Sequence, residues 1–336
     1  MTYKESPLFG LSSKRVLKYY LKIPNSNFYK QSYVAKLVHP YLENKNGKKR
    51  LIEKPDDDLK RIQTRLKRLL AKLDYPEYIF SGVRKRSYVD NAKLHKGNKF
   101  LYKIDLTAFF PSVAREKVFI FFRDKLCVSP DIAEILTNFT TIDLDMALSE
   151  DKDAIDAFLQ TKGVKTRNHL ISGSPTSQLL SYLANQDMID KLQLISQKNN
   201  IYMSVYVDDI IFSSSSRISM QFKNMINNII GSQCYHLSTK KAKTHTKFYP
   251  KKVTGVVINK FGNVSISNSL RVKLIKKLKE LKANPQDNQC RRELRGLVEA
   301  ARQVIPNAYP SIYAFAYDPQ FKLPSVQGRK VVEKNK

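Results

Sequence analysis

The feature that most constrains the fold of this chain is a pair of adjacent acids, Asp208 and Asp209, between two short apolar runs. The runs, residues 201–207 and 210–212, are rich in β-branched and aromatic residues, and serines close the second run. This pattern predicts a β-hairpin with both carboxylates at or near its turn. Two neighbouring carboxylates repel each other, and apolar surroundings add a desolvation cost, so a half-buried pair needs a cation. The alternative is an ordinary Asp-Asp turn on the protein surface.

A third acid, Asp105, stands near the end of another apolar run, residues 100–106. If that strand and the hairpin are neighbours in one sheet, the three carboxylates meet. Carboxylates are suitable ligands for Mg²⁺, which takes oxygen ligands and shares one or two carboxylates with the phosphates of a substrate. Two such ions would activate an attacking 3′ hydroxyl and stabilise the leaving pyrophosphate. The pattern therefore favours a nucleotidyl transferase, although Asp105 alone is also compatible with a turn cap after a strand.

Charge is distributed unevenly along the chain. The formal net charge is +29, from 59 basic and 30 acidic residues. Residues 1–100 carry 24 basic and 9 acidic residues (net +15), residues 101–239 carry 13 and 15 (net −2), and residues 240–336 carry 22 and 6 (net +16). Two basic ends around a slightly acidic middle indicate a protein whose ends bind a polyanion while its middle holds metal ions.

The cysteines and the N-terminus bear on the compartment. Three cysteines, far apart in the sequence, match neither a zinc spacing nor a disulfide framework, so a reducing environment is expected. The first residues lack the apolar core of a signal peptide, and no apolar run approaches the roughly 18 residues of a membrane span. We therefore expect a cytoplasmic protein that does not associate with a membrane.

The remaining pattern is mainly helical. Apolar residues at helical spacing predict helices at residues 59–73, 112–126, 178–195, 268–283 and 291–303. The first of these has a basic face and follows a basic strand at residues 48–55, which favours contact with nucleic acid. Residues 253–259 are strand-like. Six acids between 141 and 161 are interpreted as a solvated insertion without site chemistry.

The order of these motifs resembles that of a reverse transcriptase. Asp105 stands where the first motif of that family has its metal-binding aspartate, and Tyr206-Val207-Asp208-Asp209 is similar to the Tyr-x-Asp-Asp box. The resemblance implies an α+β fold with the architecture of a right hand, in which an antiparallel palm sheet carries the Asp triad. The domains it implies are N-terminal helices and fingers at 1–99, a palm at 100–258 that includes the acidic insertion, a helical thumb at 259–323 and a disordered tail at 324–336.

The resemblance extends to residues that would surround an incoming nucleotide. Phe110, five residues after Asp105, matches the aromatic residue that excludes a 2′ hydroxyl. Gly173 and Ser177 match the glycine and serine of the second motif, although Ile171 and Gln178 replace its two usual prolines.

Basic residues complete the nucleotide site that the resemblance implies. Lys49, Arg50 and Arg61 fall where the fingers of the family hold the triphosphate and the template. A lysine that protonates pyrophosphate is expected after the hairpin. Lys243 precedes a threonine as in the family, whereas Lys241 fits the spacing to the later motifs better, so both stay open.

Two short motifs resemble elements of retron reverse transcriptases and imply RNA binding. Asn91 and His95 belong to an Asn-Ala-x-x-His sequence, and Val253, Thr254 and Gly255 form a Val-Thr-Gly sequence. The retron resemblance implies a bacterial, cytoplasmic enzyme that uses dNTPs and two Mg²⁺ ions. It would copy part of a structured non-coding RNA (msr-msd) into single-stranded DNA (msDNA), primed from an RNA 2′ hydroxyl. A separate effector protein and a role in anti-phage defence are also implied.

Two other interpretations stay open. The chain resembles other bacterial reverse transcriptases, of the group II intron or abortive-infection type, and Val207 stands where most retron enzymes have alanine. A catalytically idle RNA-binding scaffold is the alternative from a different class, and the presence of the three acids and Phe110 argues against it.

Overall fold

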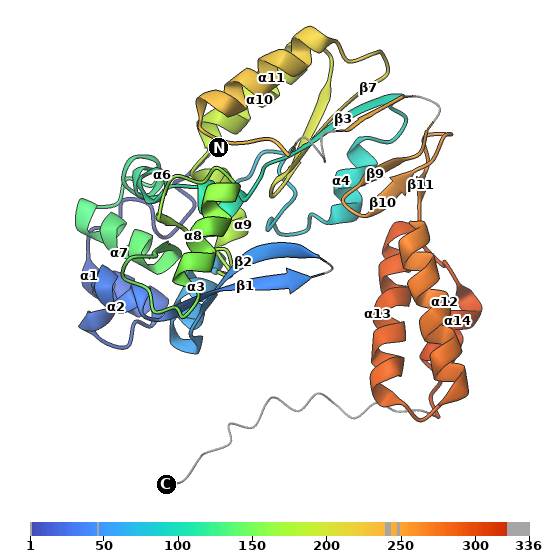
Figure 1. Cartoon of the computed structure of the whole chain (residues 1–336), viewed down its shortest axis with the longest axis horizontal. Coiled ribbons are helices and arrows are strands. Elements are labelled where there is room, and N and C mark those ends of the chain that lie inside the picture. Colours follow the sequence, from blue (N-terminus) through green and yellow to red (C-terminus); the bar gives the residue numbers. More distant parts are fainter. Residues whose placement is uncertain (1, 46, 239–242, 247–248, 321–336) are drawn as a thin grey trace. The chain divides into compact units, whose positions relative to one another are not determined.

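The computed structural model describes residues 2–45, 47–238, 243–246 and 249–320 (Figure 1). Contacts within the chain divide it into two compact units, Met1–Tyr249 and Pro250–Lys336, and each is described by itself. Helices and strands both occur in each unit, in agreement with the predicted α+β class. In the described part of the chain, no helix combines the length and the apolar character that crossing a membrane requires.

A four-stranded antiparallel sheet is the centre of the first unit. Its order is β6 (Tyr202–Tyr206), β7 (Asp209–Ser214), β3 (Phe100–Asp105) and β8 (Lys243–His245). Strands β6 and β7 form the hairpin that the sequence predicts, and β3 pairs with β7 along its whole length. The sheet therefore brings Asp105 next to the hairpin, as required if the three acids are to meet.

One face of this sheet packs against helix α11 (Met220–Ser232) through aromatic side chains. Helix α11 lies beside α10 (Gln186–Lys198) in Figure 1. The ring of Phe212 stacks on Tyr102 at 5.9 Å between centroids and meets Phe222 of α11 edge-on at 5.4 Å. Offset and edge-on pairs of this kind add about 0.5–1.5 kcal/mol to the burial of the rings. The packing holds β3 and β7 together on the side opposite Asp209.

The N-terminal part of the first unit is a layer of short helices beside a two-stranded hairpin. The hairpin consists of β1 (Val38–Lys45) and β2 (Lys48–Pro55). Helix α3 (Asp57–Leu70) begins just after Pro55, with acids in its first turn and bases in its last, which suits the helix dipole. Its apolar stripe is buried, as predicted. The neighbouring elements are α1 (Lys14–Leu21), a 3-10 turn (Ser26–Tyr29) and α2 (Gln31–Ala35). Helix α4 (Tyr88–Leu94) packs instead against β6 of the central sheet.

Two helices that the sequence predicts as continuous are interrupted. The segment 112–126 consists of α5 (Phe109–Ser112), an extended Val113, α6 (Arg115–Ile120) and a π-helical turn (Phe121–Lys125). The segment 178–195 consists of α9 (Ser177–Leu183) and the start of α10. Apolar spacing continues across both interruptions, so periodicity does not reveal them.

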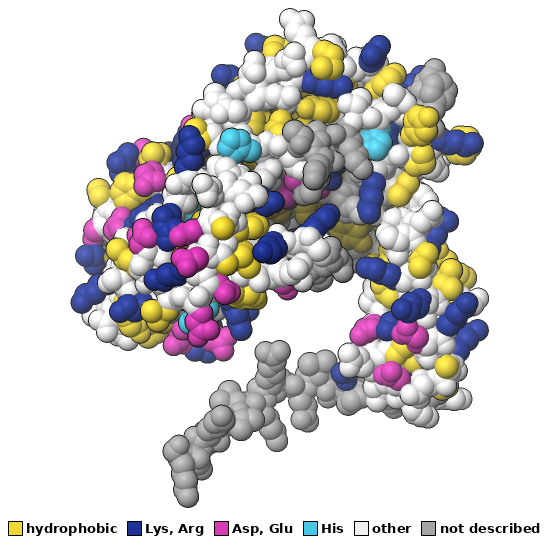
Figure 2. Space-filling view, viewed as in Figure 1, with side chains coloured by type: hydrophobic (Ala, Val, Ile, Leu, Met, Phe, Trp, Pro, Cys, Tyr) yellow, Lys and Arg dark blue, Asp and Glu magenta, His cyan; other side chains and the backbone are white. Residues whose placement is uncertain are grey.

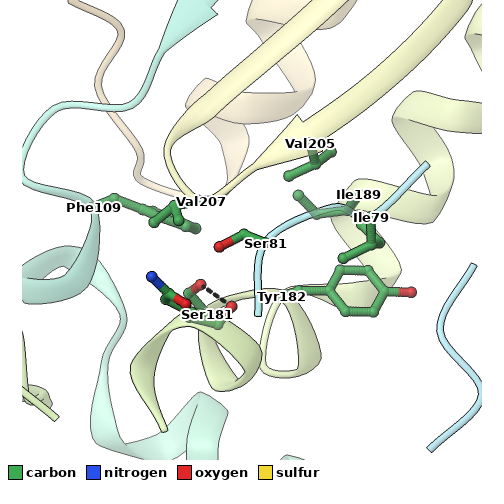
Figure 3. A pocket seen from close by; sticks show the side chains of 9 residues that line it. Ile79, Ser81, Phe109, Ser181, Tyr182, Ile189, Val205 and Val207 are labelled. Atoms are coloured by element: carbon green, nitrogen blue, oxygen red, sulfur yellow. Dashed lines mark hydrogen bonds between the residues drawn. The ribbon is translucent and has the colours of Figure 1, made fainter. Parts of the chain in front are cut away.

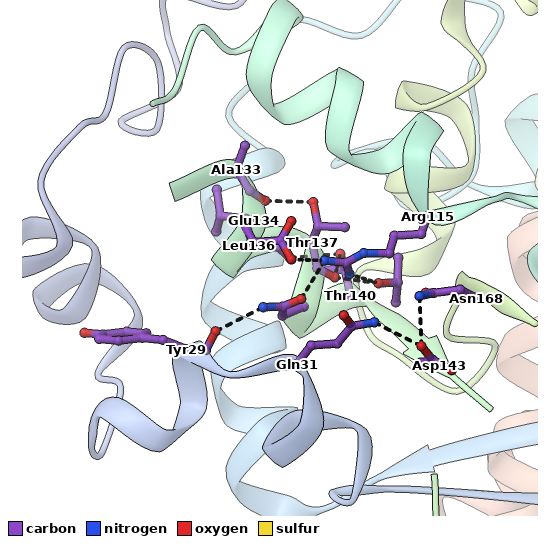
Figure 4. A network of polar contacts seen from close by, with 12 residues as sticks. Tyr29, Gln31, Arg115, Ala133, Glu134, Leu136, Thr137, Thr140, Asp143 and Asn168 are labelled. Atoms are coloured by element: carbon purple, nitrogen blue, oxygen red, sulfur yellow. Dashed lines mark hydrogen bonds and ion pairs between the residues drawn. The ribbon is translucent and has the colours of Figure 1, made fainter. Parts of the chain in front are cut away.

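The buried Arg115 explains why the first interruption is stable. Its guanidinium donates to Thr141 Oγ1 at 2.8 Å, to Asn138 Oδ1 at 2.7 Å and to Glu134, of which the last two lie in α7 (Pro130–Thr140) (Figure 4). A buried guanidinium needs such partners, because leaving one unpaired costs several kcal/mol. The new helix start at Arg115 aims its side chain at these acceptors.

The predicted acidic insertion, residues 141–161, is ordered. It consists of β4 (Thr141–Asp143), paired with β5 (Asn168–Leu170), and α8 (Lys152–Thr161). Arg167 forms ion pairs with Asp145, at 2.8 Å, and with Asp156. Some of these acids therefore hold the insertion together.

The second unit begins with a three-stranded sheet of β9 (Lys251–Val253), β10 (Val256–Ile258) and β11 (Val264–Ser265). The predicted single strand at 253–259 is instead a tight hairpin, because Thr254 and Gly255 both have positive φ (44° and 94°), as in a two-residue turn. Three helices follow, α12 (Asn268–Ala283), α13 (Asn288–Val304) and α14 (Pro310–Ala316). The predicted palm end at 258 falls inside this sheet.

Candidate active site

The acid hairpin, by which we mean β6, the Val207-Asp208 turn and β7, sets the position of two of the three acids. Tyr206 and Asp209 are the last paired residues, so the loop has only two residues. In the neighbouring strand Asp105 is the register partner of Asp209, and its side chain is only 5% exposed. The backbone N–H of Leu106 donates to the Asp208 carbonyl at 3.0 Å. The structure therefore brings Asp105, Asp208 and Asp209 to one end of the sheet.

Val207 occupies a backbone position that is unfavourable for its residue type. Its φ is +58°, a left-handed conformation that β-branched residues rarely adopt and that costs about 1–3 kcal/mol. Its side chain lines a small cavity with Phe109 and Ser81, with room for roughly one water molecule (Figure 3). This packing below the turn holds Val207 in place, and the strain lies directly beside the acids.

Lys103 is a residue of this site that the sequence reasoning missed. Its Nζ lies 2.6 Å from Asp209 Oδ2, and both side chains are about four-fifths buried (21% and 19% exposed). The signal was available in the sequence, since residues two apart on a strand share a face and Lys103 precedes Asp105 by two. The ammonium supplies the cation that a half-buried carboxylate requires.

The donor chemistry of the site fits divalent metal ions. Two carboxylates on adjacent strands, with a third in the connecting turn, offer hard oxygen ligands of the kind Mg²⁺ uses together with substrate phosphates. The cation at Asp209 shows that the carboxylates are placed to bind positive charge. Within the described residues, no group of three or more Asp, Glu, His or Cys side chains is arranged so that it could hold a metal ion. The oxygen donors of Asp105, Asp208 and Asp209 are of the kind that suits a metal ion shared with substrate phosphates.

Gly173 lies in a close contact with strand β2. A Cβ added at Gly173 would meet the Glu53 carbonyl oxygen at 2.3 Å, so only glycine fits without a backbone shift. The contact is reinforced by Ser172, whose backbone N–H donates to Glu53 Oε2 at 2.7 Å. The fully buried His169 pairs with the other carboxylate oxygen of Glu53 at 2.6 Å. These contacts fix the β1–β2 hairpin, which carries Lys49 and Arg50, relative to the predicted second motif.

Ser177 and Phe110 differ in how far their side chains are buried. Ser177 is 1% exposed, and its hydroxyl donates to the carbonyl of Ile171, so its side chain is occupied within the chain. Phe110 is half-buried on α5 and lies nearly parallel to Phe109 at 6.3 Å, while Phe109 packs edge-on against Tyr235 at 5.5 Å. Phe110 is therefore the more accessible of the two.

Three of the predicted basic residues, Lys49, Arg50 and Arg61, are exposed. Lys49 and Arg50 are exposed on β2, and Arg61 on α3 forms an ion pair with Asp58. Lys243 is the first residue of β8 and the register partner of Lys103, which precedes Asp105 by two residues in strand β3. Lys241 lies outside the described residues.

On the face shown in Figure 2, acidic side chains of the first unit gather mainly near α7 and α8.

The residues predicted to bind RNA are placed in both units. Asn91 and His95 belong to the first unit and are 0% exposed, with His95 at the C-terminal cap of α4. Burial lowers the pKa of His95 to about 3. In the second unit Val253 is fully buried at the end of β9, and Thr254 and Gly255 form the turn after it. Their RNA contacts stay a prediction.

An antiparallel sheet with an aspartate beside an Asp-Asp hairpin is the arrangement of a template-directed nucleic-acid polymerase. Residues 42–282 match the family described as reverse transcriptase (RNA-dependent DNA polymerase). The chain belongs to this family, as its motifs predict. Reverse transcriptases use divalent metal ions, in accordance with the donor set.

Curated relatives confirm the resemblance to retron reverse transcriptases. The retron Se72 reverse transcriptase of Salmonella heidelberg (strain 579083-10) is 27% identical over 212 residues, covering 60% of this chain and 47% of the relative. The retron Ec83 and Ec86 enzymes of Escherichia coli are 24% and 26% identical, over 76% and 65% of this chain and 79% and 62% of their own lengths. The matched region thus spans about half of the Se72 enzyme and less than two thirds of the Ec86 enzyme.

The contact at Gly173 leads to a prediction. Gly173→Ala should lower the free energy of unfolding by about 1–3 kcal/mol, because the new methyl group forces the Glu53 backbone away. Its φ is not positive, so the effect is steric. Gly231→Ala is the matched control, since it lies in α11 of the same unit with nothing within 4 Å of an added Cβ. Urea unfolding of both variants measures the difference, and equal stabilities would contradict the steric argument.

Proposed function

We propose that this chain is the RNA-directed DNA polymerase of a retron. It copies part of a structured non-coding RNA (msr-msd) into single-stranded DNA (msDNA), starting from a 2′ hydroxyl of that RNA. The observation that carries the proposal is the pairing of Asp105 with Asp209 beside the Asp208 turn, in a chain of the reverse transcriptase family. The names of the relatives and the two short motifs support the retron assignment.

In this proposal the two units correspond to the parts of a right hand. Residues 1–99 form the fingers and N-terminal helices, 100–258 the palm and 259–323 the thumb. The four-stranded sheet is the palm sheet, and the helices after 267 are the thumb. The proposed tail, 324–336, lies outside the described residues. The net charge of +16 over residues 240–336 suits a thumb that binds an RNA stem through its phosphates and its shape.

In nucleotidyl transfer the three acids bind metal ions, and Lys103 positions one of the acids. Asp105, Asp208 and Asp209 would hold two Mg²⁺ ions, which when bound lower the pKa of the attacking 3′ hydroxyl and stabilise the leaving pyrophosphate. Lys103 neutralises Asp209 and keeps its carboxylate oriented along the sheet.

Other residues bind and select the nucleotide. The exposed Lys49 and Arg50 of β2 and Arg61 of α3 bind the triphosphate and the template strand. Lys243, next to the acids in strand β8, donates a proton to a pyrophosphate oxygen, and Lys241 remains the alternative donor. Gly173 and Ser177 shape the floor of the nucleotide site through their contacts with β2 and Ile171.

The proposed partners follow from the retron assignment. They are the msr-msd RNA, the DNA product, dNTP substrates and a separate effector protein, in the cytoplasm of a bacterium that the system defends against phage. Asn91, His95 and the Val253-Thr254-Gly255 turn support RNA binding. Because Asn91 and His95 are buried, any contribution from them passes through the fold of their segment.

Asp208→Asn should abolish DNA synthesis on a primed RNA template while leaving RNA affinity nearly unchanged. Loss of one carboxylate removes a metal ligand, whereas RNA binding depends on the basic ends of the chain. Primer extension and a filter-binding assay measure the two effects. Asp187→Asn is the control, because Asp187 is exposed on α10 and forms an ion pair with Lys125. Extension by Asp208→Asn at the wild-type rate would show that the site is misassigned.

Phe110→Val should admit ribonucleotides. In the proposed site the half-buried ring, backed by Phe109, excludes a 2′ hydroxyl. Shortening the ring should therefore reduce the preference for dNTP over rNTP at least tenfold, about 1.4 kcal/mol. Single-nucleotide incorporation measures the preference. Phe119→Val, which removes an identical ring from α6, should leave it unchanged. An unchanged preference in Phe110→Val means that another residue selects the sugar.

Purified from its native host, the protein should carry a defined RNA joined to a short DNA. The 5′ end of the DNA should be linked to an RNA 2′ oxygen, because synthesis starts from that hydroxyl. RNase treatment should leave a short ribonucleotide remnant on the DNA, and a 2′–5′ debranching enzyme should release it. Free cDNA with an ordinary 5′ end, and no branched product, would leave another type of bacterial reverse transcriptase as the function.

A further inference from the structure

The ring of His95 is enclosed in the first unit against the acid hairpin. Its Nδ1 lies 2.7 Å from Ser213 Oγ on β7, and its Nε2 lies 2.7 Å from Ser204 Oγ on β6. All three side chains are 0% exposed. The Asn98 amide, three residues on, donates to the same Ser213 oxygen at 2.8 Å. One imidazole therefore joins both strands of the hairpin to each other and to the end of α4.

The two serines occupy related positions in the hairpin. Ser204 is paired with Ile211, and Ser213 is paired with Tyr202, so the serines are diagonal neighbours on one face. Since side chains alternate along a strand, this is also the face of Asp209, four residues before Ser213. The bridge and the acid thus belong to the same row of strand β7, and a shift of the strand moves both.

A neutral imidazole is well suited to this bridge. It has one N–H donor and one acceptor nitrogen, and a serine hydroxyl complements either. Desolvation keeps the ring uncharged in the range of a polymerase assay, since burial lowers the pKa of His95 to about 3. The bridge is consequently a fixed structural link that does not change its charge during the reaction.

The hairpin needs such a link because its turn is strained. Val207 holds a left-handed backbone conformation, and relaxation there would move Asp208. A shift of one residue between β6 and β7 would turn Asp209 to the opposite face. We propose that His95 is a positioning residue for nucleotidyl transfer, which locks the register of β6 against β7 and so holds the acids in place.

This inference rests on the proposed polymerase function and assigns a different role to His95 from direct RNA contact. If the ring contacted RNA, its loss would weaken RNA binding and spare extension of an annealed DNA primer. If the ring positions the hairpin, its loss slows nucleotide addition on every primed template and leaves RNA affinity unchanged. The two roles therefore differ in which measured constant changes.

The test uses Ser213→Ala, Ser204→Ala and His95→Phe in the full-length protein. Ser214→Ala is the matched control, because it removes an identical buried hydroxyl from the same strand. That hydroxyl bonds to Ser216, two residues further along the chain. On an annealed DNA primer, we expect kcat to fall roughly 10- to 100-fold in the three variants, since small displacements of catalytic groups have effects of this size. KM for dNTP and the Kd for RNA should change by less than about twofold, and Ser214→Ala should behave as wild type.

Hydrogen exchange gives a second readout that does not depend on activity. In Ser213→Ala the amides of β6 and β7 should exchange faster, while those of α3 keep the wild-type rate. Unchanged kcat and unchanged exchange in these variants, with an active wild-type protein, would overturn the positioning role. A weakened Kd for RNA with normal kcat would assign His95 to RNA binding instead. If the wild-type protein itself extends no primer, the proposed function fails, which is a separate result.

Discussion

The pairing of β3 with β7, in which Asp105 faces Asp209, is the interaction on which the rest of the site depends. These strands are separated by about one hundred residues in the sequence, so no local preference brings the acids together. The register is set by burial, because a slip of one residue would expose Ile104, Ile210 and Phe212 and turn the acids toward the core. The packing of Phe212 between Tyr102 and Phe222 resists that slip on one face. On the other face the His95 bridge joins β7 to its second neighbour, β6.

The same pairing creates an electrostatic conflict within the sheet. Three carboxylates at one end of a sheet repel one another, and Asp105 is almost fully buried. Lys103, which lies two residues before Asp105, reduces this repulsion because it forms an ion pair with Asp209. Tertiary packing compensates for the strain at Val207. A site of this kind is stable because the surrounding core is rigid, and it favours cations for the same electrostatic reason.

The sequence predicted those helices and strands that depend on the local pattern of apolar and polar residues. The hairpin around Asp208, the strand ending at Asp105 and helix α12 at 268–283 follow directly from alternation and helical spacing. The interruption at Val113 was missed because a tertiary contact, the Arg115 network, decides it. The break between α9 and α10 was missed because the apolar spacing continues across it. The hairpin at 254–255 was missed for another reason, since Thr254 in a left-handed conformation is unusual and only Gly255 signals a turn.

Burial separates the roles of motif residues that sequence comparison treats alike. Lys49 and Phe110 remain accessible, so their side chains are available to a nucleotide. Ser177 and His95 have no exposed surface to offer, and their polar atoms are already engaged by Ile171, Ser204 and Ser213. A motif can therefore mark a family either because its residues contact the substrate or because they hold those that do. In this chain the second reason applies to His95, whose neutral ring replaces water around two strand hydroxyls and thereby fixes the geometry of the neighbouring acids.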